Sequence, residues 1–134
     1  MNNILFKAKR IDNNEWVCGD FRFDLQSESH KNSNIIYPRE NSRNEGKCFF
    51  VDAVTVSQYT GKNDKNRIRI FEGDIVKCDI ITGAKSSKKE KGIVFYEENI
   101  CAFCVKAENS NQKYILGTLE NLEVVGNIYD KGDI

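Results

Sequence analysis

Three carboxylates in the middle of the chain are the first residues whose types and spacing suggest chemistry. Asp64, Glu72 and Asp74 lie within residues 58–76, which read QYTGKNDKNRIRIFEGDIV. Clustered carboxylates can hold a cation or act as acid and base. An EF-hand loop places its ligands at regular alternate positions and ends in Glu at the twelfth, and that spacing is absent here. Turn formation is the stronger interpretation, and the residues assigned to it are Gly61, Asp64, Asn66, Glu72, Gly73 and Asp74.

The thiols and the single histidine offer little for catalysis or metal ligation. Of the five cysteines, only Cys101 and Cys104 form a CxxC pair. A zinc ribbon needs a second such pair, and a thioredoxin-like motif lies at the start of a helix. His30 lies in a polar segment without a set of neighbouring ligands. We therefore predict no catalytic set, no metal and no cofactor, and we expect most thiols to be small core residues.

The most basic local patch is residues 85–91, KSSKKEK, with four lysines and one glutamate. We interpret it as the solvated tip of a hairpin loop that follows Thr82 and Gly83 and is closed by Gly92. The alternative is contact with a phosphate backbone. The residues that would make this contact are Lys85, Lys88, Lys89 and Lys91, with Arg67 and Arg69 beside them.

Composition limits the classes of partner. The chain has 134 residues, with 20 basic and 20 acidic side chains, and its two halves are each balanced. No global field therefore attracts nucleic acid or acidic lipids, although a local patch is still compatible with binding. An odd number of cysteines, no signal peptide and no apolar run of about 18 residues predict a cytoplasmic protein without a membrane partner.

The elements that would position these residues are short strands in hairpin order. Alternating apolar residues and turn signals predict a mainly β fold of about nine to eleven strands. We expect one domain over residues 1–134, with an N-terminal β lobe at 1–60 and a lobe at 61–134. The second lobe is expected to form a small SH3-like or partly open barrel. The only helical signal is one turn at residues 119–122, with Thr118 as its N-cap. Trp16 is expected to cover the core or to stack on a ligand.

Three blocks of the chain resemble the YopX family of phage and prophage proteins. They are FKAKRIDNNEWVCGDF at residues 6–21, QYTGKNDKNRIRIFEGDIV at 58–76 and LENLEVVGNIYD at 119–130. In similar proteins the central turn reads Asp-Lys-Asn-Gly, whereas Arg67 stands at the glycine position here. Because that position favours positive φ, Arg67 predicts a strained or altered turn. The resemblance implies a mainly β fold and a phage context, and it carries no reaction and no catalytic residue.

Three functional classes follow. The first is a non-enzymatic accessory protein that acts as an interaction module, with a protein partner or self-association through β-strand edges. The second is a nucleic-acid-binding protein that uses residues 85–91. The third and weakest is a hydrolase-type enzyme, which would require Asp64, Glu72 and Asp74 to gather in a pocket with perturbed pKa values.

Overall fold

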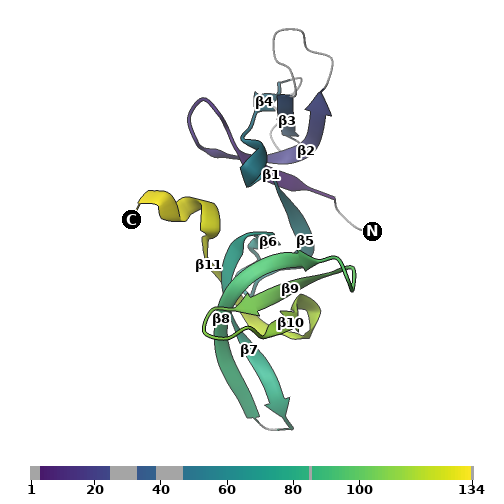
Figure 1. Ribbon diagram of the computed structural model, residues 1–134, viewed down its shortest axis with the longest axis vertical. Helices are drawn as coiled ribbons and strands as arrows, with labels where there is room; N and C mark the ends of the chain where they lie inside the picture. The colour runs from purple at the N-terminus through teal and green to yellow at the C-terminus, as the bar shows by residue number, and fades with distance from the viewer. Residues whose placement is uncertain (1–3, 25–32, 39–46, 85, 134) are drawn as a thin grey trace. The chain divides into compact units, whose positions relative to one another are not determined.

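The computed structural model describes residues 4–24, 33–38, 47–84 and 86–133. The chain is mainly β, all of its paired strands are antiparallel, and the helical segments of the described part are short 3-10 turns. It divides into two compact units, Met1–Tyr59 and Thr60–Ile134 (Figure 1). The prediction of a mainly β fold is confirmed.

The N-terminal unit is built on a hairpin that is extended on one side. Its strands are β1 (Phe6–Lys9), β2 (Trp16–Asp24), β3 (Ser33–Pro38) and β4 (Phe49–Phe50), in the order β4-β3-β2-β1. A 3-10 turn, η2 (Ala53–Thr55), follows β4. Ala8, Ile36 and Val51 are buried together between these elements. The unit's small core therefore joins residues that are more than forty positions apart.

Strand β5 (Ser57–Asn63) carries the chain from one unit into the other. Its first residues pair with β1, where Ser57 lies opposite Lys7. The turn predicted at Gly61 is wrong, because Gly61 lies within β5. The strand passes through Gly61, whose φ of +88° is accessible to glycine at little cost, and it is followed by β6 (Arg69–Phe71).

The C-terminal unit contains a five-stranded antiparallel sheet in the order β10-β9-β8-β7-β11 (Figure 1). The strands are β7 (Asp74–Gly83), β8 (Ser86–Glu97), β9 (Ala102–Ala107), β10 (Lys113–Ile115) and β11 (Glu120–Asn127). The 3-10 turns η3 (Leu116–Thr118) and η4 (Ile128–Asp133) precede and follow β11. As described, the sheet is open, and its strands do not close into a barrel.

One face of this sheet forms the core of the unit, because side chains alternate between the two faces of a strand. Val76, Cys78, Val94, Val105 and Leu122 point inward and are buried, together with Ile70 of β6. The intervening residues form the opposite side, which we call the outer face. It carries Lys77, Asp79, Lys89, Lys91, Lys106, Lys113 and Glu123.

Two local predictions are wrong in this unit. Residues 86–91 are part of β8 and not a loop, because the β7–β8 ladder continues through the pairs Ile80–Lys88 and Cys78–Glu90 to a turn between Gly83 and Ser86. Cross-strand backbone pairing therefore overrides the weak strand preference of Lys and Ser. The expected helical turn at residues 119–122 is displaced, because the 3-10 turn covers Leu116–Thr118 and β11 already begins at Glu120.

Candidate functional site

Asp64 organises the tight turn between β5 and β6. One of its carboxylate oxygens, Oδ1, accepts the backbone N–H groups of Asn66 at 2.8 Å and Ile68 at 2.9 Å. The backbone closes the turn as well, because Asp64 N–H donates to the Ile68 carbonyl at 2.7 Å. Arg67 adopts φ of +66° in this turn, a left-handed conformation that costs a non-glycine residue about 1 kcal/mol.

The same carboxylate attaches the turn to the edge of β11. Its second oxygen, Oδ2, accepts Val124 N–H at 2.9 Å, and Lys65 N–H donates to the Leu122 carbonyl at 2.8 Å. Burial alone would raise the pKa of Asp64, but the backbone donors of Val124, Ile68 and Asn66 outweigh it, so that the pKa lies below its ordinary value. The turn also covers backbone groups that an exposed strand edge would offer to a partner.

Asp74 holds the second turn of the central segment against the end of the chain. Its side chain accepts Phe71 N–H at 2.8 Å and the Asn127 amide at 2.9 Å, and both polar side chains are buried. Gly73 adopts φ of +84°, donates to the Val94 carbonyl at 2.8 Å and accepts Ile128 N–H at 3.0 Å. The central segment and residues 119–130 are therefore joined by hydrogen bonds at two places.

These contacts decide what the three central carboxylates can do. Asp64 and Asp74 are buried, and their oxygens accept hydrogen bonds from the chain, while Glu72 is half-buried. Within the described residues, no three His, Cys, Asp or Glu side chains come together as a metal site. The geometry makes the two aspartates parts of the framework.

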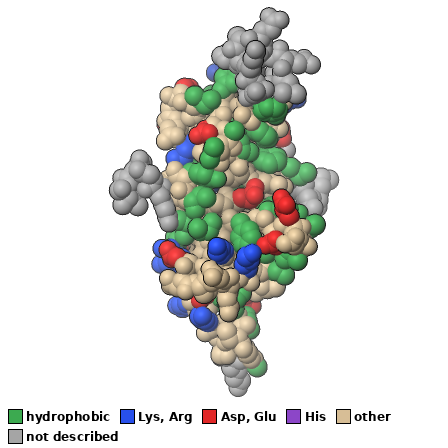
Figure 2. Space-filling model, in the orientation of Figure 1, with side chains coloured by type: hydrophobic (Ala, Val, Ile, Leu, Met, Phe, Trp, Pro, Cys, Tyr) green, Lys and Arg blue, Asp and Glu red, His purple; other side chains and the backbone are tan. Residues whose placement is uncertain are grey.

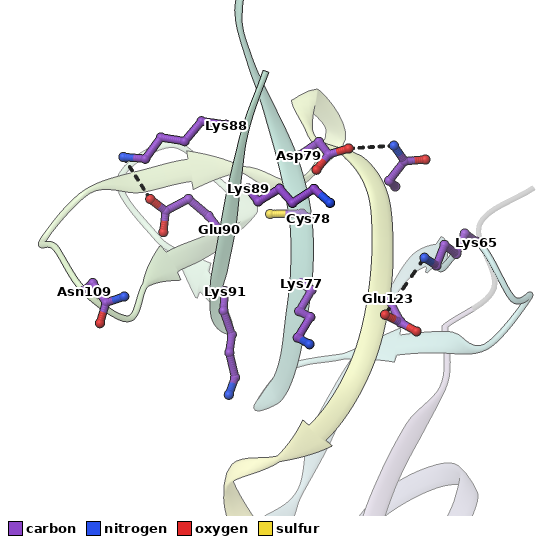
Figure 3. A pocket seen from close by; sticks show the side chains of 11 residues that line it. Lys65, Lys77, Cys78, Asp79, Lys88, Lys89, Glu90, Lys91, Asn109 and Glu123 are labelled. Atoms are coloured by element: carbon purple, nitrogen blue, oxygen red, sulfur yellow. Dashed lines mark hydrogen bonds and ion pairs between the residues drawn. The ribbon is translucent and has the colours of Figure 1, made fainter. Parts of the chain in front are cut away.

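A groove in the C-terminal unit is lined mostly by charged side chains (Figure 3). Its volume is about 720 Å³. Strands β7, β8 and β11, the β5–β6 turn and the residues after β9 supply its lining. The lining residues are Lys65, Lys77, Cys78, Asp79, Lys88, Lys89, Glu90, Lys91, Asn109, Asn121 and Glu123.

Three of the groove lysines share the outer face of the β7–β8 hairpin. Lys77 lies directly opposite Lys91, and Lys89 lies opposite Asp79. The side chains of Lys77 and Lys91 extend in the same direction from neighbouring strands (Figure 3). Like charges placed directly opposite each other destabilise a sheet. The Lys77–Lys91 pair is therefore unfavourable for folding alone.

The three acidic residues of the groove come from three strands, Asp79 from β7, Glu90 from β8 and Glu123 from β11. Glu123 is opposite Lys77 and approaches the Lys65 ammonium at 3.9 Å. Asp79 accepts a hydrogen bond from the Asn121 amide at 2.7 Å. The visible surface of this unit accordingly shows acidic and basic side chains near one another (Figure 2). The outer face is thus basic along β8 and acidic along β11.

The structure separates the basic residues that were grouped by sequence. Lys89 and Lys91 lie on the outer face, whereas Lys88 points to the opposite face and pairs with Glu90 at 3.0 Å. Lys85 is outside the described residues. Arg67, in the β5–β6 turn, and Arg69, in β6, do not line the groove. The structure adds Lys77, which the alternation along residues 75–81 could have placed on the same face.

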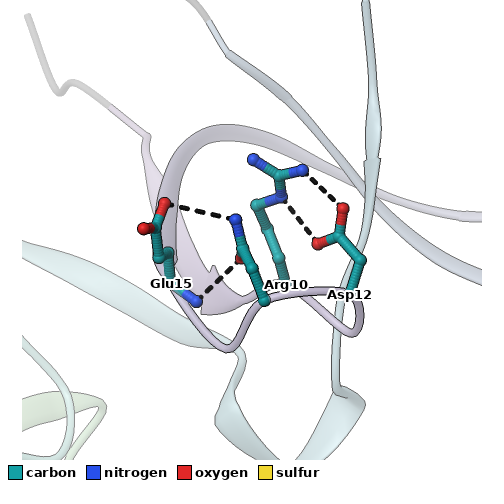
Figure 4. Close-up of polar contacts among 4 residues, drawn as sticks. Arg10, Asp12 and Glu15 are labelled. Atoms are coloured by element: carbon teal, nitrogen blue, oxygen red, sulfur yellow. Dashed lines mark hydrogen bonds and ion pairs between the residues drawn. The ribbon is translucent and has the colours of Figure 1, made fainter.

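Side-chain hydrogen bonds hold the turn between β1 and β2 in the N-terminal unit (Figure 4). Arg10 donates from Nε and Nη2 to the two carboxylate oxygens of Asp12, at 2.9 and 2.5 Å, and Asn13 bonds Glu15 in the same loop. The hydrogen bond from Arg10 lowers the pKa of Asp12. Trp16 is half-buried, with the ammonium groups of Lys7 and Lys9 at 4.5 and 5.5 Å from its ring. His30 is outside the described residues.

None of the five cysteines, all of which lie in the described residues, forms a disulfide. Cys101 is exposed in the turn before β9, whereas Cys104 is buried within that strand. Burial raises the pKa of Cys78 to about 11, with Glu90 and Asp79 adding to the shift, and burial also raises the pKa of Cys104. The two buried thiols are therefore poor nucleophiles and poor metal ligands near neutral pH.

The family model described as YopX protein matches residues 5–133, nearly the whole chain. The chain belongs to the YopX family. Among curated proteins, none matches the chain. The two motif blocks at residues 58–76 and 119–130 are the segments that Asp64 and Asp74 join. Among the described residues, no helix is long and apolar enough to cross a membrane.

Proposed function

We propose that this YopX-family chain is a non-enzymatic accessory protein of a phage or integrated element, and that it acts as an interaction module. Its binding surface is the outer face of the C-terminal unit. The observation that carries this proposal is the groove of about 720 Å³ lined by Lys77, Lys89 and Lys91, of which Lys77 and Lys91 lie directly opposite each other although like charges disfavour strand pairing. Binding of an oppositely charged partner would relieve that repulsion.

The contrast with the central carboxylates supports a binding role over a hydrolase. A catalytic acid or base must reach the substrate proton, and Asp64 and Asp74 already accept hydrogen bonds in buried positions. The groove contains carboxylates, but Asp79 is held by Asn121 and Glu123 lies near Lys65 and Lys77. These acids balance part of the groove's charge and help to orient its side chains.

We also propose that the C-terminal unit is a variant of a small SH3-like barrel. The order β10-β9-β8-β7-β11 and the 3-10 turn between the last two strands support this proposal. In this arrangement the long β7–β8 hairpin carries Lys77, Lys89 and Lys91 of the binding face. Short edges limit pairing with a partner strand, because β10 has three residues and the Asp64 turn covers Leu122 and Val124 of β11.

The proposal is tested by capture of partners from the host after phage induction. Tagged wild-type protein and a variant with Lys77→Ala, Lys89→Ala and Lys91→Ala are purified side by side, at low and at high salt. We expect a stoichiometric partner with the wild-type protein and its loss with the variant. An unchanged set of partners for both proteins would contradict the assignment of this face.

A control variant separates loss of the face from loss of the fold. Lys62→Ala removes a lysine of β5 that does not line the groove. Circular dichroism and thermal melting of each variant verify that it is folded. Capture that fails equally with Lys62→Ala would show that reduced charge, and not this face, decides binding.

A further inference from the structure

We propose that the partner recognised by this face is the phosphate backbone of nucleic acid, bound without reading its sequence. This inference rests on the proposed function and names its class of partner. It is carried by five lysines that the strand register places on the outer face across four neighbouring strands. We call them the lysine track: Lys77, Lys89, Lys91, Lys106 and Lys113.

The register makes this track continuous. Lys77 is opposite Lys91, which is two residues from Ile93 on β8. Ile93 is opposite Lys106 on β9, and Lys106 is opposite Lys113 on β10. Directly opposite side chains in an antiparallel pair are about 5 Å apart, and diagonal neighbours about 7 Å apart. No step along the track therefore exceeds the reach of a lysine side chain.

Most of the positive charge of the track is not neutralised. Among the described residues, the side chains of Lys77, Lys89 and Lys106 form no ion pair, and the first two flank the groove. Lys91 is 3.9 Å from a carboxylate oxygen of Glu108, a separation at the limit of an ion pair. Only Lys113 has a closer contact, with Glu97 at 3.3 Å. A net-neutral chain thus presents a local row of available cations.

The length and chemistry of the track fit a phosphate backbone. Four strands about 4.8 Å apart span about 14 Å. One strand of a duplex carries a phosphate about every 3.4 Å along the helix axis, so that the track spans about four phosphates. Lysine contacts phosphate as a point charge, and the track contains no arginine that could bind a base in a bidentate manner. These features predict affinity without sequence specificity.

A nucleic acid explains this arrangement better than an acidic protein does. Protein interfaces are depleted in lysine and depend on buried aromatic or arginine anchors. The track offers no such anchor apart from Phe95, which is half-buried and has Lys113 at 5.7 Å from its ring. Binding by many exposed ammonium groups is instead typical of phosphate contacts that depend on the release of counterions.

The test is the salt dependence of binding to a fluorescein-labelled 20-base-pair DNA duplex, measured by fluorescence anisotropy. If all five lysines contact phosphates, the slope of log K against log salt is about −4.5, a loss of roughly 500-fold between 50 and 200 mM. Replacement of Lys77, Lys89 and Lys91 by Ala should reduce the slope to about −1.8, a loss of roughly 12-fold. In a second series, an unlabelled 20-nucleotide single strand competes with the labelled duplex for the protein. This competition shows whether the protein prefers single-stranded or double-stranded DNA.

Two single substitutions provide a control. Lys89→Ala should reduce the magnitude of the slope by about 0.9, because Lys89 lies on the track. Lys62→Ala should leave the slope unchanged, because Lys62 belongs to β5 and lies neither on the track nor in the groove lining. Circular dichroism of each variant verifies its fold, and the slope reports contacts independently of a general loss of affinity.

The outcomes separate this inference from the proposed function. Equal slopes of log K against log salt for the wild-type protein and the triple variant would contradict the proposal that the lysine track contacts phosphates. If the duplex and the single strand both fail to bind at 50 mM salt, while the capture experiment yields a protein partner that depends on Lys77, Lys89 and Lys91, the inference fails and the interaction module stands. If neither nucleic acid nor a partner binds through this face, both fail.

Discussion

Replacement of Asp64 by asparagine should destabilise the C-terminal unit strongly although the side chain keeps its size. The carboxylate accepts three backbone N–H groups, from Asn66, Ile68 and Val124. An amide has one acceptor oxygen, so that its NH₂ group faces the Val124 N–H as a second donor. Loss of that bond to a charged acceptor costs about 2 kcal/mol, and weakening of the other two adds about 1 kcal/mol. The expected total is about 3 kcal/mol.

Urea denaturation measures this change. With a slope of about 1.5 kcal/mol per molar urea, 3 kcal/mol shifts the midpoint by about 2 M. Asp79→Asn is the matched control in the same unit, because Asp79 accepts one bond from Asn121 and is only half-buried. Asp79→Asn should lower the free energy of unfolding by less than about 1 kcal/mol. If the two variants were equally stable, the reasoning about Asp64 would be refuted.

The effect of Asp64→Asn should also depend on pH. Because the folded-state pKa of Asp64 lies below its ordinary value of 3.8, the ionised form is favoured in the folded chain. Its contribution is therefore fully present above pH 4 and is lost as the pH falls through the lowered pKa. The stability difference between the wild-type protein and the variant should shrink below about pH 4. A difference that stays constant down to pH 2 would contradict this assignment.

Three further results are expected. Arg67→Gly should stabilise the chain by about 0.5–1 kcal/mol in urea denaturation, since glycine relieves the φ of +66° at some entropic cost; a destabilised variant would contradict this. Gly92→Ala should lower the free energy of unfolding by about 3 kcal/mol, because the added Cβ would lie 2.3 Å from the backbone carbonyl oxygen of Lys106. Gly117→Ala should leave the free energy of unfolding nearly unchanged, because there is open space around Gly117. In iodoacetamide labelling at pH 8, read by mass spectrometry, Cys101 should react quickly and Cys78 only after unfolding; equal rates would refute the burial argument.

The fold class and family could be predicted from sequence because both depend on local patterns. Alternating apolar residues and turn residues predicted the mainly β chain, and three ordered motif blocks predicted the YopX family, which the match to residues 5–133 confirms. The bond from Asn66 N–H to Asp64 is likewise local, since it spans two residues. The bond from Val124 N–H to Asp64 spans sixty residues, and no local pattern indicates it.

The binding face was only partly predictable for the same reason. Lys88, Lys89 and Lys91 form one basic run in the sequence, but the register of β8 divides them between two faces. Residues 85–91 were predicted as a loop because Lys and Ser are weak strand formers, and the ladder with β7 overrides that preference. Lys77 and Lys106 join the outer face only through strand pairing, which composition does not report.

Lysine footprinting of the captured complex tests most directly whether the outer face is the binding surface. The wild-type protein is treated with an acetylating reagent, alone and with its partner bound, and each modified lysine is quantified by mass spectrometry. We expect Lys77, Lys89 and Lys91 to lose reactivity in the complex, while Lys62, which does not line the groove, keeps it. Protection confined to Lys62 or the N-terminal unit, with the outer face still fully reactive, would contradict this assignment.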